Sequence, residues 1–350
     1  MENHIPDRLY LDHAATTPVL PAARAAIADA WGRWANPSSP HAEGRAARAE
    51  LERARQRIKA ALGWPHAIIF TGGASEAAAL AMARTVGQTR LVSAVEHDAV
   101  RRAAPDAAIL AVGADGLVDP DALPEARLFA IQSVNSETGV IQPAALGDAI
   151  HAKGGLWLAD CAQSAAKLPL PDADLIIVSA HKLGGPPGVG AVLVRDLAML
   201  AAVGGQEQGY RGGTENLPAI LGFAAALEAR GARAHLPGLR AMLDDGVRAR
   251  GGEVVAEASP RLAEIASYRI AGRPAAAQLI ELDLAGIAVS AGSACSSGSL
   301  KPSPVLLAMG WDETRAREVI RVSLAPETSE SDIARFLDSW GRIVGRARAA

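Results

Sequence analysis

The sequence contains few cysteines. Only two, Cys161 and Cys295, occur in 350 residues. Two cysteines are too few for a disulfide framework or for a metal site with four cysteine ligands, so the sequence predicts neither. This usage fits a reducing compartment, and we expect a cytoplasmic protein without a bound metal.

Long apolar runs are also missing, and neither sign of charge dominates. No run approaches the ~20 residues that a membrane-spanning helix needs. The N-terminal segment, residues 1–8, is short and polar, so we expect no secretory signal peptide. Lysine and arginine together number 35 and the acidic residues 38, a net charge of −3. The sequence therefore predicts neither a membrane nor a nucleic acid as a partner.

The remaining composition is that of a globular protein with a large hydrophobic core. Hydrophobic residues make up 49% and charged residues 21% of its 350 residues, a length that favours two domains. Short apolar strands alternate with helical stretches up to about residue 221, and the later strands are fewer and more widely spaced. We expect an α/β architecture: a large domain (15–221) with a mostly parallel, mixed sheet flanked by helices, and a smaller α+β domain (1–14 and 222–350).

Polar residues follow directly after several of the predicted strands. They are His97, Asn135, Asp160, Gln163 and Lys182. Because the carboxyl ends of parallel strands share one edge of a sheet, we expect these side chains to converge on one crevice. Each of them alone also has a simpler interpretation as a turn or cap residue.

The stretch from Ser179 to Gly190 contains the most reactive combination. A hydroxyl, an imidazole and an amine, from Ser179, His181 and Lys182, lie between a buried strand and a loop rich in glycine and proline. A lysine held at such a strand end can lose its proton and act as a nucleophile, for example in a Schiff base with an aldehyde cofactor. A solvated lysine beside an ordinary turn is the alternative interpretation.

A second stretch indicates an anion site. The predicted strand 67–70 leads into Thr-Gly-Gly-Ala-Ser-Glu (71–76) and then an alanine-rich helix. Backbone N–H groups at a helix N-terminus, here with Ala74 and Ser75, suit a phosphate. The spacing is not that of a P-loop, and a tight turn capped by Ser75 is the alternative.

The two cysteines lie in different surroundings. Cys295 is flanked by small, polar, loop-forming residues (291–302), where a thiolate is accessible and reactive, although an incidental exposed cysteine would have the same neighbours. Cys161 follows a predicted strand, and we expect it to be buried and inert.

Together these motifs resemble the cysteine desulfurases of the aminotransferase class V family, of the nitrogen-fixation and iron–sulfur-cluster type. The most telling are Tyr-Leu-Asp-His-Ala-Ala-Thr-Thr-Pro (10–18), Ser-Ala-His-Lys-Leu-Gly-Gly-Pro (179–186) and Ser-Ala-Cys (293–295). The others are 36–39, 70–76, 96–97, 135–139, 160–164, 211–214 and 321–323. They occur in family order over nearly the whole chain, whereas residues 231–264 match poorly.

The resemblance implies a homodimer with the fold of type I pyridoxal 5′-phosphate (PLP) transferases. Lys182 would bind the cofactor covalently, Asp160 would pair with its ring nitrogen, and Gln163 would bond its ring hydroxyl. His97 would stack on the ring and help to move protons. Four residues would hold the phosphate: Ala74, Ser75, Ser179 and His181. Thr214 would reach the same phosphate from the partner subunit.

At the substrate end, the resemblance implies that Asn135 and Arg321 grip the carboxylate of L-cysteine. Cys295 would take the sulfur as a persulfide and pass it to an acceptor protein, for iron–sulfur cluster assembly or for thiolation. A selenocysteine lyase or another class V enzyme is the alternative. A non-catalytic sulfur-relay partner is disfavoured because the reactive residues are all present. A nicotinamide-dependent dehydrogenase is weaker still, because no Gly-x-Gly-x-x-Gly follows the first strand.

Overall fold

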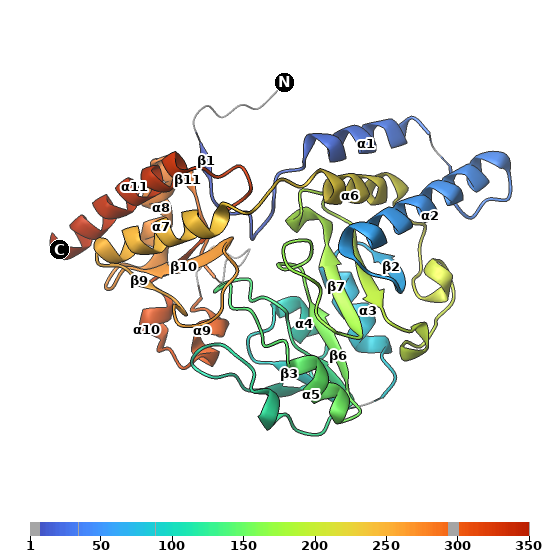
Figure 1. The fold of residues 1–350 in the computed structure, drawn as a ribbon, viewed down its shortest axis with the longest axis horizontal. Coiled ribbons are helices and arrows are strands. Elements are labelled where there is room, and N and C mark those ends of the chain that lie inside the picture. The colour runs from blue at the N-terminus through green and yellow to red at the C-terminus, as the bar shows by residue number, and fades with distance from the viewer. Residues whose placement is uncertain (1–7, 34, 88, 293–300, 350) are drawn as a thin grey trace.

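The computed structural model describes residues 8–33, 35–87, 89–292 and 301–349. The chain forms two lobes that lie side by side, and the N-terminal strand lies in the same lobe as the last third of the sequence (Figure 1). Cys295, the expected sulfur acceptor, lies outside the described residues.

The larger lobe is organised by one mixed sheet, in which the described residues form seven strands in the order β2-β8-β7-β6-β5-β3-β4. The strands are β2 (Ala67–Thr71), β3 (Arg90–Ser93), β4 (Ala108–Leu110), β5 (Leu128–Ala130), β6 (Leu156–Asp160), β7 (Leu175–Ser179) and β8 (Gly190–Val194). Of these, β8 alone runs antiparallel to its neighbours. The predicted mostly parallel sheet is confirmed, and the carboxyl ends of the other six strands share one edge.

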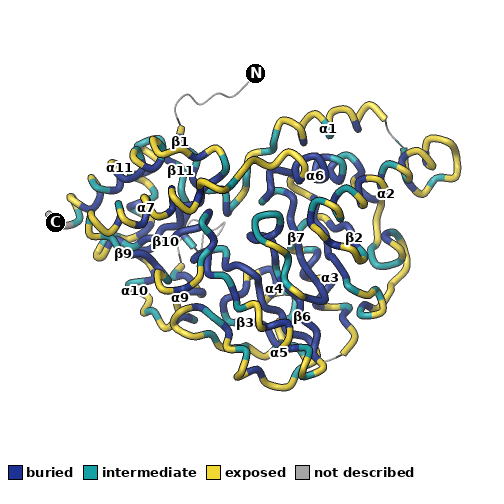
Figure 2. Tube along the Cα trace, in the orientation of Figure 1, coloured by how far each residue is buried: buried dark blue, intermediate teal, exposed yellow. Residues whose placement is uncertain are grey.

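Helices cover both faces of this sheet. They are α1 (Pro21–Trp31), α2 (Ala42–Leu62), α3 (Ala74–Arg84), α4 (Asp98–Ala103), α5 (Leu146–Ala152) and α6 (Leu217–Ala229). One face, with Phe129 and Trp157, packs against α2, α5 and α6, and the other, with Leu128 and Leu158, packs against α3 and α4. Because neighbouring residues of a strand point to opposite faces, the mainly apolar central strands are buried from both sides, whereas the edge strand β4 is largely exposed (Figure 2).

The smaller lobe has its own core. Its strands are β9 (Glu253–Val254), β10 (Ile265–Arg269) and β12 (Val319–Ser323) in an antiparallel sheet, and β1 (Leu9–Tyr10) paired in parallel with β11 (Ile287–Ala288). Its helices are α7 (Leu236–Ala249), α8 (Ala275–Leu284), α9 (Pro304–Ala308), α10 (Glu313–Ala316) and α11 (Glu330–Ala349). The rings of Tyr268, Phe336 and Trp340 are fully buried between α11 and the sheet. Short 3₁₀ turns at Pro120–Ala122, Ala180–Lys182, Leu197–Met199 and Glu207–Gly209 complete the described elements.

The division between the lobes bears on the expected domain boundary at residue 221. Helix α6 crosses that position without a break, and its side chains as far as Leu227 belong to the core of the larger lobe. Leu9 and Leu11, by contrast, are buried in the core of the smaller lobe. We propose that the boundary lies after Ala229, with the N-terminal strand assigned to the smaller domain. None of the helices in the described ranges is both long and apolar enough to cross a bilayer.

Candidate active site

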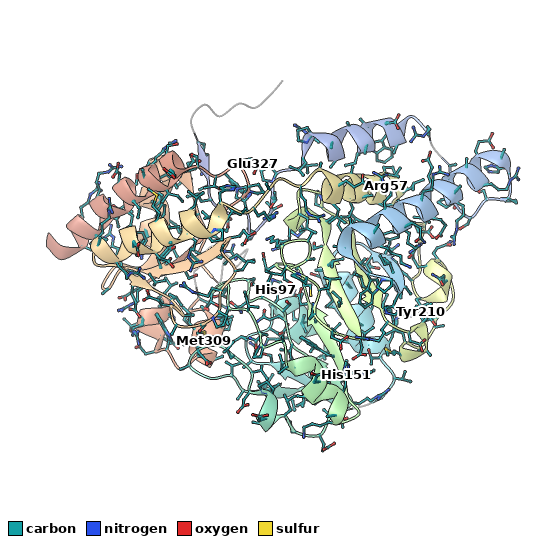
Figure 3. All side chains as sticks on the ribbon, in the orientation of Figure 1. Arg57, His97, His151, Tyr210, Met309 and Glu327 are labelled. Carbon is teal, nitrogen blue, oxygen red and sulfur yellow. The ribbon has the colours of Figure 1, made fainter. Side chains whose placement is uncertain are left out.

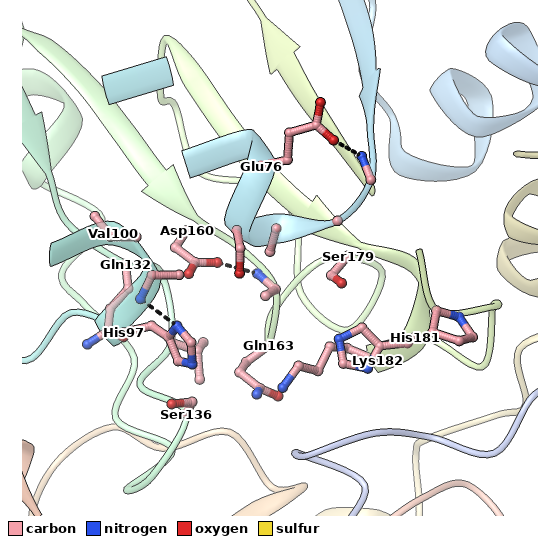
Figure 4. A pocket seen from close by; sticks show the side chains of 18 of the residues that line it. Glu76, His97, Val100, Gln132, Ser136, Asp160, Gln163, Ser179, His181 and Lys182 are labelled. Carbon is pink, nitrogen blue, oxygen red and sulfur yellow. Dashed lines mark hydrogen bonds between the residues drawn. The ribbon is translucent and has the colours of Figure 1, made fainter. Parts of the chain in front are cut away.

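A cavity of about 360 Å³ opens at the carboxyl edge of the large sheet. It is lined from the ends of β2, β3, β6 and β7, and His97 lies between the two lobes (Figures 3 and 4). Eight of the expected site residues line it: Ala74, Ser75, His97, Asp160, Gln163, Ser179, His181 and Lys182. The size and the mixture of a few polar groups with apolar walls suit a small organic ligand.

One end of this cavity is built for an anion. Helix α3 begins at Ala74 after Gly73, whose φ is 140°, and no described side chain caps its first turn. The Ser179 Oγ atom is buried, and no group in the described ranges forms a hydrogen bond with it. A Cβ atom on Gly190 would lie 2.9 Å from the Gly73 Cα atom, so the backbones meet closely here. Open N–H groups, a free hydroxyl and a helix dipole together suit a phosphate.

Lys182 extends into the cavity from the 3₁₀ turn that follows β7. Its Nζ atom donates a hydrogen bond of 2.6 Å to the carbonyl oxygen of Ala14. Burial, and next the positive charge of Arg321, lower the pKa of Lys182 to about 8, although Asp160 and Asp12 oppose the shift. A substantial share of this amine is therefore neutral near physiological pH, as a nucleophile or general base requires.

Asp160 and His97 face the cavity from the ends of β6 and β3. The Asp160 Oδ1 atom accepts a hydrogen bond of 2.8 Å from the backbone of Ala162. Burial raises the pKa of Asp160, while that hydrogen bond, His97 and Lys182 act in the opposite direction. A cationic nitrogen beside this carboxylate would relieve the cost of burying its charge.

His97 also caps α4, because its Nδ1 atom accepts a hydrogen bond of 3.1 Å from the backbone of Ala99. Nε2 therefore carries the ring proton in the neutral form. The protein around the ring restricts its hydration and lowers the pKa of His97. The imidazole is thus a neutral flat surface at the cavity wall.

Gln163 and His181 complete the first cavity. The Gln163 Nε2 atom donates a hydrogen bond of 2.9 Å to the carbonyl of Ala14, while Gln163 Oε1 has no hydrogen-bond partner among the described residues. His181 Nδ1 lies 3.2 Å from Thr16 Oγ1. Burial and the charge of Lys182 lower the pKa of His181 to about 4, so this ring is neutral.

A second cavity of about 570 Å³ adjoins the first, and His97 and Lys182 line both. Arg321 reaches it from β12 of the smaller domain and is only 7% exposed. Its Nη1 atom donates to the Ser136 carbonyl and its Nη2 atom to Asp12 Oδ1, both at 2.9 Å. Its Nε atom has no partner in the part of the chain that the structure describes. The guanidinium is placed to bind a carboxylate beside Lys182.

Two expected site residues are not among the described residues that line the two cavities. The Oδ1 atom of Asn135 accepts hydrogen bonds from Glu137 N and from Thr138 N and Oγ1. Thr214 is exposed on the loop after β8. The roles of Asn135, of Thr214 and of Cys295, which lies outside the described residues, remain predictions.

The structure adds Asp12 and Glu96 to the site. Glu96 is buried, and burial together with Asp160 raises its pKa well above the usual range, so it is a neutral acid at the wall of the second cavity. The signal in the sequence was an acidic residue immediately after an apolar strand, next to His97. Asp12 lies within the recognised motif, but its ionic partner is 309 residues away and no local pattern indicates it.

Cys161 is buried as predicted, and burial raises the pKa of its thiol to about 12.

The large domain is a three-layer α/β structure with three groups at one sheet edge. They are the Lys182 amine, the buried Asp160 carboxylate and an anion cradle, formed by the first turn of α3 and the Ser179 hydroxyl. This combination defines the class of protein. Residues 9–336 match the family model described as aminotransferase class-V. The chain belongs to the aminotransferase class-V family.

Similar proteins give this membership more detail. The chain is 37% identical to a cysteine desulfurase from Frankia sp. (strain EuIK1), over 97% of this chain and 92% of that protein. It is 36% identical to an IscS-like cysteine desulfurase of Mycobacterium tuberculosis, over 97% of each.

Solved structures agree. A NifS-like protein from Rickettsia africae has a TM-score of 0.88 and 28% identity, covering 97% of this chain and all of that one. The structure of SspA in complex with cysteine has a TM-score of 0.79 and 29% identity, covering 92% and 100%.

Proposed function

We propose that this chain is a PLP-dependent cysteine desulfurase. It converts L-cysteine to L-alanine, collects the sulfur as a persulfide on Cys295 and passes it to an acceptor protein. The observation that carries this function is the meeting of Lys182, Asp160 and His97 around one cavity with an anion cradle at its end. The relatives named cysteine desulfurase, which match nearly the full chain, select this reaction within the family.

The residues present fit PLP. The cofactor needs a phosphate site, a carboxylate for its ring nitrogen and a lysine for its aldehyde. The unpaired hydroxyl of Ser179 and the open first turn of α3 supply the first, and Ala74, Ser75 and His181 line the same region. Asp160 supplies the second and Lys182 the third.

The remaining contacts with PLP follow from the same cavity. Gln163 would bond the ring hydroxyl through its unpaired oxygen, and His97 would stack on the ring. Thr214 would complete the phosphate site of a second copy of the chain, which makes the homodimer part of this proposal. When bound, PLP supplies an electron sink that stabilises the carbanion formed at the substrate Cα atom.

The protein residues perform the proton and sulfur steps. Arg321 and Asn135 hold the substrate carboxylate, so that the Cα–H bond is presented to the Lys182 amine. The neutral form of that amine, which the lowered pKa of about 8 makes available near physiological pH, removes the Cα proton. The Cys295 thiolate attacks the substrate Sγ atom, the Cβ–Sγ bond breaks, and Cβ takes a proton. Lys182 then returns a proton to Cα, and alanine leaves. The sulfur remains on Cys295 as a persulfide, and both electrons of the broken bond leave with Cβ.

The acceptor is a protein with a nucleophilic thiol, either a scaffold for iron–sulfur clusters or an enzyme of a thiolation pathway. The chemistry of the persulfide requires only that this thiol reach Cys295. A pull-down with the persulfide form would distinguish the two kinds of acceptor. The cytoplasmic location remains a prediction.

Three variants test the proposal. The wild-type protein should bind PLP, absorb in the visible range, and produce alanine and a Cys295 persulfide in equal amounts from L-cysteine. Lys182→Ala should lose the visible band of covalently bound PLP and all turnover. Cys295→Ala should keep the band but lose sulfur transfer, whereas Cys161→Ala, which changes the other cysteine of the chain, should keep both.

The outcomes are distinct. Equal cysteine turnover by Cys295→Ala and the wild type would contradict the persulfide route. Turnover of selenocysteine but not cysteine by Cys295→Ala and wild type alike would indicate a selenocysteine lyase. A protein that gains no absorbance when PLP is added would support the non-catalytic alternative.

A further inference from the structure

We propose that Asp12 is a positioning residue of the active site, which holds the Arg321 guanidinium at the substrate end. The inference rests on the proposed function in one respect: Arg321 is taken to bind the carboxylate of the amino-acid substrate. Its remaining support comes from contacts between described residues.

The ion pair between Asp12 and Arg321 joins the two ends of the chain inside the protein. Asp12 Oδ1 lies 2.9 Å from Arg321 Nη2, and the side chains are only 19% and 8% exposed. The Ser136 carbonyl accepts from Arg321 Nη1 on the large-domain side, also at 2.9 Å. Two acceptors on different segments therefore fix the plane of the guanidinium.

This arrangement leaves donors available for a substrate. A guanidinium has five N–H groups, and Asp12 and Ser136 each accept from one nitrogen. The Nε atom is buried without a partner in the described part of the chain, and Arg321 lines the second cavity, so this N–H is available to a carboxylate oxygen. Because Asp12 orders the long arginine side chain in advance, a substrate loses less free energy in ordering it.

The same N-terminal segment also contacts Lys182. Two residues after Asp12, the Ala14 carbonyl accepts from Lys182 Nζ at 2.6 Å, and the Ala14 N–H donates to Ser323 Oγ at 2.9 Å. Asp12 itself forms a backbone bridge with Ser323 on β12. Residues 12–14 therefore hold both the arginine and the lysine at fixed positions relative to each other.

The charges around Lys182 give Asp12 a measurable effect. Arg321 lowers the pKa of Lys182, whereas Asp160 and Asp12 raise it. The other titratable groups that interact with Lys182 are His97, His181 and Lys167. Removal of the Asp12 charge leaves Arg321 less opposed, so the pKa of Lys182 should fall below its value of about 8.

Steady-state kinetics test the positioning role. Asp12→Ala should raise KM for L-cysteine by about 10-fold, the loss expected for one charge-assisted hydrogen bond, with a smaller change in kcat. Asp12→Asn, which keeps an acceptor for Arg321, should raise KM less. Asp283→Asn is the matched control, because it removes the same charge from an aspartate–arginine pair, with Arg8, at the exposed surface. It should leave KM unchanged.

Nuclear magnetic resonance tests the charge effect without turnover. The chain contains five lysines, so the ¹³Cε signals of labelled lysine can be assigned with single variants, Lys182→Ala among them. In the full-length protein freed of PLP, the titration midpoint of Lys182 should be lower in Asp12→Asn than in the wild type, and unchanged in Asp283→Asn. An unchanged KM in Asp12→Ala would overturn the positioning role, and a Lys182 titration identical in the wild type and Asp12→Asn would overturn the charge effect of Asp12.

The two proposals fail in different ways. A wild-type protein that makes no alanine from cysteine would reject the proposed function, but the lysine titration would still confirm or reject the action of Asp12. Normal wild-type turnover with no response to either Asp12 variant would reject Asp12 alone. Circular dichroism and thermal melting of both variants separate a folding defect from these outcomes.

Discussion

Lys182 and Ala14, 168 residues apart in the chain, are joined by a hydrogen bond of 2.6 Å from the lysine Nζ atom to the alanine carbonyl. Gln163 Nε2 donates to the same oxygen at 2.9 Å. One carbonyl from the N-terminal segment thus holds the Lys182 amine and the Gln163 amide at fixed positions relative to each other. The amine must break this hydrogen bond before it can react. Because the pKa of Lys182 is lowered, the amine loses its proton more easily, and breaking the bond costs less free energy.

The rate of PLP uptake should depend on the charge of Lys182. Since only the neutral amine attacks the aldehyde, uptake by the cofactor-free protein should slow by about tenfold per pH unit below the Lys182 pKa of about 8 and level off above it. Stopped-flow absorbance measures the rate. Nα-acetyl-lysine, with a pKa of about 10.4, corrects for the titration of PLP itself. A protein that follows the pH dependence of this reference would contradict the prediction.

Ser179→Ala should weaken PLP binding without destabilising the cofactor-free protein. The Ser179 Oγ atom has no partner among the described residues, so its removal costs no existing hydrogen bond and relieves the burial of a polar group. A phosphate would lose one donor, and PLP should dissociate about 10-fold more readily. Equilibrium dialysis gives the affinity and urea unfolding the stability. Loss of stability with unchanged affinity would assign Ser179 a structural role instead.

Two ion pairs on α2 should differ strongly in their contribution to stability. Arg55 pairs with Glu207 at 2.8 Å, with side chains 6% and 0% exposed, whereas Arg57 pairs with Glu228 at 2.6 Å, with side chains 41% and 45% exposed. Glu207→Ala removes the buried carboxylate and leaves the Arg55 guanidinium beside Glu52, which lies 3.1 Å from it and is 42% exposed. The loss of the buried partner should lower the free energy of unfolding by about 3–5 kcal/mol. Glu228→Ala should cost less than about 1 kcal/mol. Urea denaturation compares them, and similar losses in both variants would refute the argument from burial.

Gly190→Ala should disturb the anion cradle. A Cβ atom there would lie 2.6 Å from the Val178 carbonyl oxygen and 2.9 Å from the Gly73 Cα atom, so backbone must move. We expect a loss of about 1–3 kcal/mol in stability and a clear drop in retained PLP. Gly238→Ala is the control: it lies in α7 with no heavy atom of the described chain within 4 Å of the new methyl group. Retention of PLP by Gly190→Ala at the wild-type level would show that the cradle tolerates the shift.

Local patterns in the sequence were sufficient for most of the elements. The charged stretch 42–62, followed by Gly63, predicts a helix, and α2 has those bounds, because His41 caps its start and Gly63, in the left-handed conformation, ends it. The apolar run 128–134 predicts a strand, but β5 is shorter, Leu128–Ala130. The sequence also predicts a helix from Leu217 to about Arg230, and α6 spans Leu217–Ala229, with its apolar side chains packed on α1 and α2.

The sheet, its reactive edge and eight residues of the cavity could be predicted from short stretches of sequence, because each depends on apolar runs and on the residues that directly follow them. Only the tertiary structure could pair Asp12 with Arg321, lower the pKa of Lys182 and leave Ser179 without a partner in the described chain. Those properties depend on the burial of charges and on contacts between segments that are far apart in the chain. No pattern within a short window of residues contains that information.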